Sequence, residues 1–346
     1  MSEPLLAIDE LKVNFATDEG VVQAVDGVSF SVDRGEVVAV VGESGSGKSV
    51  TGMTLMGLTR GPNARISGSA KLDGQELLTA SNEQLRRIRG NDISMIFQDP
   101  ISSLNPVYRV GNQIVEQIRT HNPHVSKRDA MAQAVELMER VGVPRAAERL
   151  KSYPHEFSGG MRQRVMIAMA LSCSPKLLIA DEPTTALDVT IQAQILDELR
   201  TLREQTDAGI ILVTHDLAVV ADIADRVVVM YSGRVVEQGT LDELFYDPQH
   251  PYTWGLLGSI TRVDRDRSTR LPAIAGAPPS LLAPPKGCHF APRCPHAFDR
   301  CDQVPALESR LPDAPGHLDR CWLTAEQKRQ RRNVDGQIGL AAPVTA

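Results

Sequence analysis

One short segment limits the fold of this chain more than any other: residues 42–49 read Gly-Glu-Ser-Gly-Ser-Gly-Lys-Ser. They match the pattern Gly-x-x-x-x-Gly-Lys-[Ser/Thr], whose backbone N–H groups surround phosphates while the lysine adds charge and the hydroxyl binds Mg²⁺. An apolar run at 37–41 precedes the segment and a helical pattern at 49–58 follows it. A helix start attracts anions, so strand, loop and helix in this order predict a phosphate loop rather than a chance glycine turn.

A second glycine segment, formed by Ser158, Gly159 and Gly160, precedes the basic, helix-prone run at 161–164. It also offers free backbone N–H groups at a helix start, which is the property that binds phosphate. One nucleotide does not need two such loops from one domain. We therefore predict that the second loop serves a nucleotide held by another subunit.

Polar residues follow two further apolar runs, at 177–180 and 210–213, which we predict to be buried parallel strands. Asp181 is placed to bind Mg²⁺ directly or through water, and Glu182 to polarise an attacking water. His215 is placed to contact the γ phosphate or that water. The alternative is that these residues only end strands, and the presence of the phosphate loop favours the catalytic interpretation.

The chain has 346 residues, of which 42% are apolar, enough for one large domain and a smaller one. We predict an α/β core at residues 1–260. Its strands include 6–15 and 21–32 and a hairpin at 226–237. A helical block is inserted at about 99–172 and includes a helix at 131–141. Proline becomes frequent after residue 261. We predict a C-terminal extension at 261–330 and a disordered tail at 331–346.

Charge and hydropathy exclude several classes of function. The net charge of −6 gives no basic surface for nucleic acid. No apolar run reaches the roughly 18 residues that a membrane span needs, and the first residues lack a secretory pattern. We expect a cytosolic chain that serves a membrane only through partners.

Six segments occur in the order found in ABC transporter nucleotide-binding domains, and the chain resembles that family over about residues 5–260. They are residues 42–49, Gln98, and residues 157–161, 177–182, 186–188 and 215. The resemblance implies a P-loop NTPase fold with a RecA-like core, a β-subdomain and an inserted helical subdomain. It also implies a dimer in which each ATP lies between one phosphate loop and the signature segment of the other subunit.

The resemblance also implies roles for individual residues. Lys48, Glu182 and His215 would be catalytic, and Ser49 and Gln98 would bind Mg²⁺. Phe15 would stack on adenine, with Val22 as the alternative, although Phe15 could equally be a core residue of its strand. The remaining contacts to ATP would come from Gly42, Ser44, Gly45, Ser46, Gly47, Val50 and Asp181, and from the partner's counterparts of Ser158, Gly159 and Gly160.

Three longer stretches, at 97–106, 153–170 and 250–253, resemble the ATPases of dipeptide, oligopeptide and nickel importers. Phe157 and Met161 resemble the D-type subunit, which pairs with an F-type subunit. The resemblance implies two membrane permease subunits, an extracytoplasmic solute-binding protein, a position at the cytoplasmic face of the membrane, and a peptide cargo. A nickel or other small-solute importer is the alternative. A non-transport ABC ATPase is less favoured because a long coiled coil and a second ATP domain are both missing from the sequence.

Four cysteines gather near the end of the chain: Cys288, Cys294, Cys301 and Cys321. Their spacing is longer than in typical zinc sites, and four thiolates suit a [4Fe–4S] cluster with a structural role. Residues 287–295 also resemble the C-terminal region of the importer ATPases, some of which hold such a cluster. Zinc remains the alternative because three histidines lie nearby (His289, His296 and His317), and so does a site without metal. Cys173, which stands alone, is most simply a small buried residue.

Overall fold

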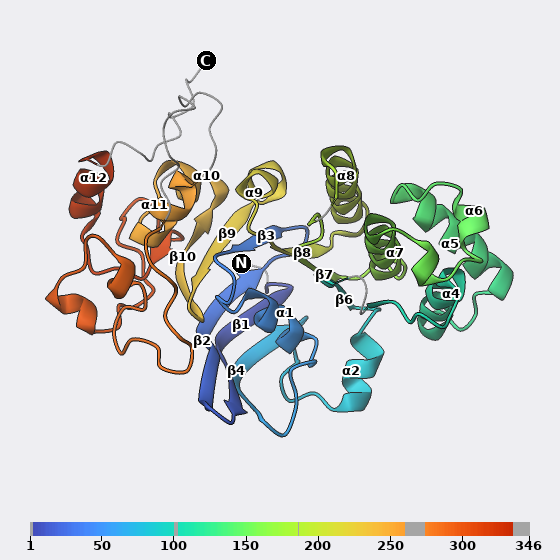
Figure 1. Ribbon diagram of the computed structural model, residues 1–346, viewed down its shortest axis with the longest axis horizontal. Helices are drawn as coiled ribbons and strands as arrows, with labels where there is room; N and C mark the ends of the chain where they lie inside the picture. Colours follow the sequence, from blue (N-terminus) through green and yellow to red (C-terminus); the bar gives the residue numbers. More distant parts are fainter. Residues whose placement is uncertain (1–2, 100–102, 186, 260–273, 335–346) are drawn as a thin grey trace, which may run out of the picture.

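The computed structural model describes residues 3–99, 103–185, 187–259 and 274–334. Parts of two predicted features lie outside these ranges: residue 186, in the fifth of the six family segments, and residues 100–102, just after Gln98. The described strands form two sheets (Figure 1). One has four strands in the order β2-β1-β4-β5, and the other has seven in the order β11-β10-β9-β3-β8-β7-β6.

The four-stranded sheet is antiparallel throughout. Both strands predicted near the start of the chain are confirmed, and each is slightly longer than expected. Apolar residues of this sheet pack into one core with α1 and with one face of the main sheet. The strands are β1 (Leu6–Thr17), β2 (Gly20–Val32), β4 (Ala64–Leu72) and β5 (Gln75–Glu76).

The seven-stranded sheet has a parallel centre formed by β3 (Val37–Val41), β8 (Gly209–Val213), β7 (Leu177–Asp181) and β6 (Ile93–Ile96). All residues of β3, β7 and β8 are buried, as expected for parallel strands covered on both faces. The predicted hairpin is also confirmed, as β9 (Arg226–Tyr231) and β10 (Arg234–Thr240). The carboxyl ends of the parallel strands therefore meet at one edge.

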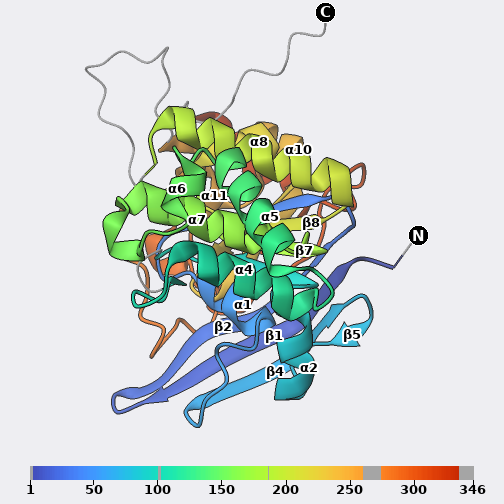
Figure 2. The same cartoon turned by 90° about the vertical axis from the view of Figure 1, so that its right-hand side faces the viewer.

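Most helices lie around the main sheet. The helical block forms one end of the molecule in Figure 1, and Figure 2 shows it above the layer of β1, β2 and β4. The predicted helix at 131–141 begins earlier, at Lys127, because the Ser126 hydroxyl accepts a capping bond from Asp129 N–H. The helices are α1 (Lys48–Leu55), α2 (Asn82–Ile88), α4 (Val110–His121), α5 (Lys127–Arg140), α6 (Ala146–Arg149), η1 (Pro154–Glu156), α7 (Gly159–Leu171), α8 (Val189–Thr206), α9 (Leu217–Ile223), α10 (Leu241–Tyr246) and α11 (Pro251–Gly258).

The C-terminal segment joins the main sheet. It contains η2 (Ala291–Arg293), η3 (Asp299–Asp302), β11 (Leu318–Asp319) and α12 (Ala325–Val334), and β11 pairs antiparallel with β10. The extension is thus part of the same packed body as the ATPase core. The prediction of a disordered tail from residue 331 is wrong for residues 331–334, which belong to α12; residues 335–346 lie outside the described ranges.

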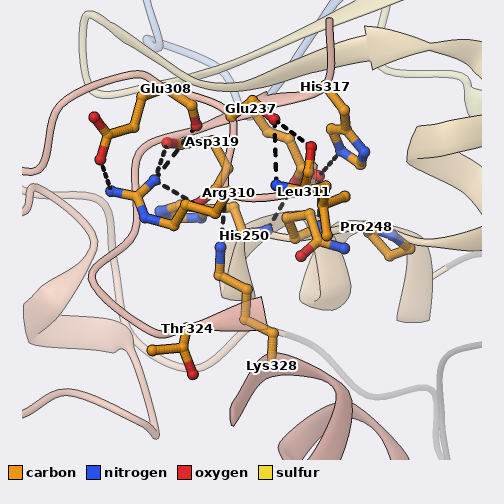
Figure 3. Close-up of polar contacts among 12 residues, drawn as sticks. Glu237, Pro248, His250, Glu308, Arg310, Leu311, His317, Asp319, Thr324 and Lys328 are labelled. Carbon is orange, nitrogen blue, oxygen red and sulfur yellow. Dashed lines mark hydrogen bonds and ion pairs between the residues drawn. The ribbon is translucent and has the colours of Figure 1, made fainter. Parts of the chain in front are cut away.

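Buried charges hold this segment against β10 (Figure 3). Glu237 on β10 is fully buried and accepts hydrogen bonds from His317 Nε2 (2.8 Å) and from the backbone N–H of His250 (2.9 Å). Asp319 on β11 accepts one from Lys328 Nζ of α12 at 2.7 Å. Burial works against the charge on Glu237, but the hydrogen bond and charge of His317 lower its pKa overall. Each buried charge therefore has a partner: Glu237 and His317 pair across the contact with β10, and Asp319 and Lys328 pair within the C-terminal segment.

The described helices include none that is both long and apolar enough to cross a membrane.

Candidate active site

The phosphate loop lies between β3 and α1, as predicted. Two of its glycines are required by their surroundings: a Cβ on Gly42 would lie 2.1 Å from Met230 O, and one on Gly47 would lie 2.5 Å from Ala24 O. Lys48 Nζ donates to the carbonyl oxygens of Gly42 (2.7 Å) and Glu43 (2.9 Å). Burial lowers the pKa of Lys48, although neighbouring carboxylates counteract this. The loop therefore holds one buried amine at its centre.

Ser49 and Asp181 meet across the edge of the sheet. Ser49 Oγ donates to Asp181 Oδ1 at 3.0 Å, and Asp181 is almost fully buried at the end of β7. Burial raises the pKa of Asp181, as does the charge of Glu182, while Ser49 and Lys48 lower it. A hydroxyl and a carboxylate in contact beside the phosphate loop form an oxygen-rich pair of the kind that Mg²⁺ prefers.

Glu182 is the centre of the catalytic candidates. Its carboxylate contacts His215 Nδ1 (3.1 Å) and accepts hydrogen bonds from Gln98 Nε2 (3.3 Å) and Thr185 Oγ1 (2.9 Å). The backbone of Glu182 has a φ of 49°, in the left-handed region that non-glycine residues rarely adopt. The structure thus brings Gln98, Glu182 and His215 together, on a backbone conformation at Glu182 that is unusual for a residue other than glycine.

Phe15 lies on β1 directly opposite Val22 on β2. Its side chain is half-buried and packs against the core shared with the antiparallel sheet, as does that of Val50 on α1. Both positions allow one side of the residue to face a ligand. The role of Phe15 in adenine stacking stays a prediction. Its alternative role is seen in part, because the side chain packs against the core.

The second glycine segment forms the start of α7. Ser158 caps this helix by accepting a bond from Met161 N–H at 3.3 Å, and a Cβ on Gly159 would meet nothing within 4 Å. Space is therefore open at the helix start. Phe157, by contrast, is buried in the core of the helical block, and Met161 packs against that core. The side chain of Phe157 therefore packs inside the helical block and is not exposed beside the glycines.

Helix α7 also contacts the residues that follow β7, a connection that the sequence pattern did not indicate. Gln163 is buried and its Nε2 donates to Pro183 O at 2.5 Å. A weaker contact reaches Glu182 O at 3.4 Å. The helix that begins with the second glycine segment is thus linked to the backbone of the candidate base.

All four C-terminal cysteines line one cavity, together with apolar residues of the same segment. The thiols are not joined in disulfides. Among the residues that the structure describes, no three His, Cys, Asp or Glu side chains approach closely enough to hold a single metal ion. The donor set itself, four cysteines around one largely apolar cavity, matches the ligands of a [4Fe–4S] cluster. Burial raises the pKa of Cys294 and of Cys321 to about 12.

Two of the three histidines considered as zinc ligands are engaged elsewhere. His289 Nδ1 contacts Ser232 O at 2.8 Å, and His317 contacts Glu237. Only His296 of the three lines the cysteine cavity, where His250 joins it. The prediction that His289 and His317 could complete a zinc site with these cysteines is wrong, because neither histidine lines the cysteine cavity.

The sequence pattern also gave no sign of a contact between the phosphate loop and the C-terminal segment. Arg293 of η2 forms two hydrogen bonds with the carboxylate of Glu43, at 2.6 Å and 3.1 Å. The two residues are 250 positions apart, so no local pattern could reveal the pair.

The comparisons with known proteins agree with this geometry. A family model described as "ABC transporter" matches residues 25–185, and one described as "Oligopeptide/dipeptide transporter, C-terminal region" matches residues 236–301. The solved structure titled as a post-hydrolysis dimer of the ATP-binding cassette MJ0796 bound to ADP and Pi is 25% identical, with a TM-score of 0.63 over 68% of this chain and 98% of that one. An ATP-binding subunit of an ABC transporter is 30% identical, with a TM-score of 0.57 over 69% of this chain and 91% of that one.

Two curated relatives match almost the whole chain. The oligopeptide transport ATP-binding protein OppD of Escherichia coli is 51% identical over 94% of this chain and 95% of its own length. The dipeptide transport ATP-binding protein DppD of Bacillus subtilis is 51% identical over 96% of this chain and 98% of its own length. This chain belongs to the ABC transporter family, among the oligopeptide and dipeptide transport ATP-binding proteins.

Proposed function

We propose that this chain is the ATP-binding and ATP-hydrolysing subunit that energises an importer of dipeptides or oligopeptides. The main observation behind this proposal is the position of two pairs, Ser49–Asp181 and Glu182–His215. They lie together at the carboxyl edge of the main sheet, beside Lys48. This is the set of groups that phosphoryl transfer requires. The peptide cargo is supported by the names of the relatives, and a nickel or other small-solute cargo is the alternative.

Each group has a proposed role in hydrolysis. The loop N–H groups of residues 42–49, with Lys48, would bind the β and γ phosphates and offset their charge. Ser49 and Gln98 would bind Mg²⁺, with Asp181 acting directly or through water. Glu182 would orient and deprotonate the attacking water, and His215 would hold that carboxylate and contact the γ phosphate. Phe15 and Val50 would contact the base side of the nucleotide.

The open start of α7 supports a dimer in which Ser158, Gly159 and Gly160 bind the ATP of a partner subunit. We propose an F-type ATPase subunit as this partner, on the resemblance of Phe157 and Met161 to the D-type. Because Phe157 is buried, it would act on the partner's nucleotide only through the packing of the helical block.

This chain would act at the membrane by binding membrane-embedded partner subunits. Val107 and Tyr108, just beyond Gln98, expose 72% and 57% of their surface and offer apolar area for two permease subunits. We propose that the chain sits at the cytoplasmic face of the membrane, where these subunits couple it to an extracytoplasmic solute-binding protein.

The four cysteines that line one cavity are the basis for proposing a [4Fe–4S] cluster. It would be held by Cys288, Cys294, Cys301 and Cys321. When bound, such a cluster would supply four iron–thiolate bonds that brace the C-terminal segment where it packs on the ATPase core. Zinc held by the same thiolates is the rival outcome.

Reconstitution tests the whole proposal. The chain would be co-expressed with its neighbouring ATPase, permease and solute-binding genes, purified in detergent and placed in proteoliposomes. We expect the permeases to co-purify with it and labelled peptide to accumulate only with ATP. Uptake of nickel but not of peptide would favour the alternative cargo. Co-purification with ribosomes or DNA, without permeases, would contradict a transport role.

A further inference from the structure

The C-terminal segment reaches into the phosphate loop through one side chain. Arg293 Nη1 and Nη2 donate to the two carboxylate oxygens of Glu43, at 2.6 Å and 3.1 Å. The Arg293 side chain is 5% exposed and that of Glu43 is 27% exposed. A bidentate, largely shielded pair of this kind fixes the position of the carboxylate.

Arg293 is itself held from several directions. Its Nε donates to Ala275 O at 2.9 Å, and Nη2 also donates to Ile274 O at 3.2 Å. Nη1 donates to the Tyr231 hydroxyl at 3.2 Å. These bonds hold the guanidinium from outside the phosphate loop, as an anchor for Glu43 requires.

The loop backbone is anchored at the same residue. Glu43 N–H donates to the Tyr252 hydroxyl at 2.8 Å, while Glu43 O accepts from Lys48 Nζ at 2.9 Å. Tyr252 packs against Tyr231 and against Phe290, which is three residues from Arg293. One aromatic cluster thus supports both contacts to Glu43.

The charge of Glu43 poses a problem for a site that binds a triphosphate. A carboxylate inside an anion-binding loop repels the phosphates unless a cation offsets it. Arg293 supplies that cation at the Glu43 carboxylate, whereas the hydrogen bond from Lys48 goes to the Glu43 backbone oxygen.

We propose that Arg293 is a positioning residue for ATP binding, which neutralises Glu43 and fixes the phosphate loop from the C-terminal segment. The inference rests on the ATP site proposed above. It gives the segment a direct function in nucleotide affinity, whatever the cysteine cavity holds.

Equilibrium binding of Mg-ATP to the purified full chain tests the inference. We expect Arg293→Ala to raise the Kd about tenfold, because it leaves Glu43 unpaired beside the phosphates. Adding Glu43→Gln should return the Kd to within about threefold of the wild type, since the repelling charge is then gone. A merely structural role for Arg293 predicts no such recovery. Arg300→Ala is the matched control, because Arg300 lies in the same segment but stacks on Trp322.

Three results would decide against the inference: an unchanged Kd in Arg293→Ala, a double variant as weak as the single one, or an equal loss in Arg300→Ala. If Arg293→Ala does not fold, Arg293→Lys with and without Glu43→Gln gives the same comparison. The expected rise in the Kd for Mg-ATP is then smaller. A wild-type chain that binds no Mg-ATP would instead contradict the proposed function.

Discussion

Glu182 Oε1 and His215 Nδ1 lie 3.1 Å apart, at the ends of two neighbouring parallel strands. The strands β7 and β8 fix the two backbones, so the contact needs no flexible loop to form. The histidine is largely exposed while the carboxylate is mostly covered. An exposed partner of this kind is free to respond to a bound nucleotide while the carboxylate stays in place.

Replacing Glu182 by Gln is expected to reduce ATP turnover by at least about 100-fold, because the amide cannot accept a proton from water. ATP binding should stay within about threefold of the wild type, since the shape is preserved. Steady-state hydrolysis by the assembled transporter and nucleotide binding would be measured together. Glu204→Gln, an exposed position on α8, is the control. Normal turnover in Glu182→Gln would rule out this residue as the base.

Replacing Ser49 by Ala should raise the Mg²⁺ concentration needed for half-maximal activity by about tenfold, because one oxygen ligand is lost. The hydrogen bond to Asp181 also disappears, so the carboxylate loses one of the groups that lower its pKa. Activity would be titrated with Mg²⁺ at fixed ATP, with Ser67→Ala on the exposed edge of β4 as control. An unchanged Mg²⁺ dependence would speak against Ser49 as a ligand.

Replacing Gly159 by Ala should leave the folded chain unchanged, since an added Cβ meets nothing within 4 Å. In the proposed dimer the methyl group would face the partner's nucleotide. We therefore expect transporter ATPase activity to fall by about tenfold or more, while Mg-ATP binding and the Tm of the isolated chain do not change. Full activity of the assembled Gly159→Ala transporter would contradict a role in the partner's site.

Anaerobically purified chain is expected to contain about four iron and four sulfide per molecule, with broad visible absorbance. Cys294→Ser should lose most of both, because it removes one of the four thiols that share the cavity. Cys173→Ser, outside that cavity, is the matched control and should keep them. Stoichiometric zinc without iron would show that the rival assignment is right.

The contact between His317 and Glu237 predicts a pH-dependent stability. Burial opposes the charge on His317, but the hydrogen bond to Glu237, with Glu243 and Asp247 nearby, raises the pKa of His317 above 6.5. A histidine whose folded pKa is raised stabilises the fold below its unfolded value, and this contribution is lost as pH rises through the folded value. His317→Gln should therefore destabilise the chain by about 2 kcal/mol at pH 6 and by less at pH 9.

Thermal unfolding of the wild type and of His317→Gln at both pH values measures this difference. His250, whose pKa burial lowers to about 4, is present in both proteins and so does not affect the comparison. A difference in stability that grows from pH 6 to pH 9 would show that His317 is not charged in the folded chain.

The parts of the fold that the sequence predicted well are those set by local patterns. Continuous apolar runs located β3, β7 and β8, and their shared direction placed Asp181, Glu182 and His215 at one edge. Glycines in a fixed pattern located the phosphate loop because backbone clashes leave no alternative residue at Gly42 and Gly47. In these segments, residues close together in the sequence determine the local structure.

The parts that could not be predicted depend on contacts between distant segments. Arg293 and Glu43 each have ordinary neighbours, and only the folded chain joins them. The helix α12 was missed because Lys328, which is buried in it, is polar and pairs with Asp319, so the helix shows no apolar stripe. Likewise, His289 and His317 looked like metal ligands by proximity in sequence, although backbone and carboxylate oxygens hold them.

The two-residue strand β11 bears on whether the chain aggregates while it is being synthesised. Without it, β10 is an edge strand with unpaired N–H and C=O groups, the kind of surface on which other chains assemble into aggregates. Arg320 extends the cover, since its N–H donates to Val236 O at 2.8 Å and its Nε to Val235 O at 2.9 Å. Residues 318–320 are made after β10, so the edge of the sheet stays open to other nascent chains until these residues have been made.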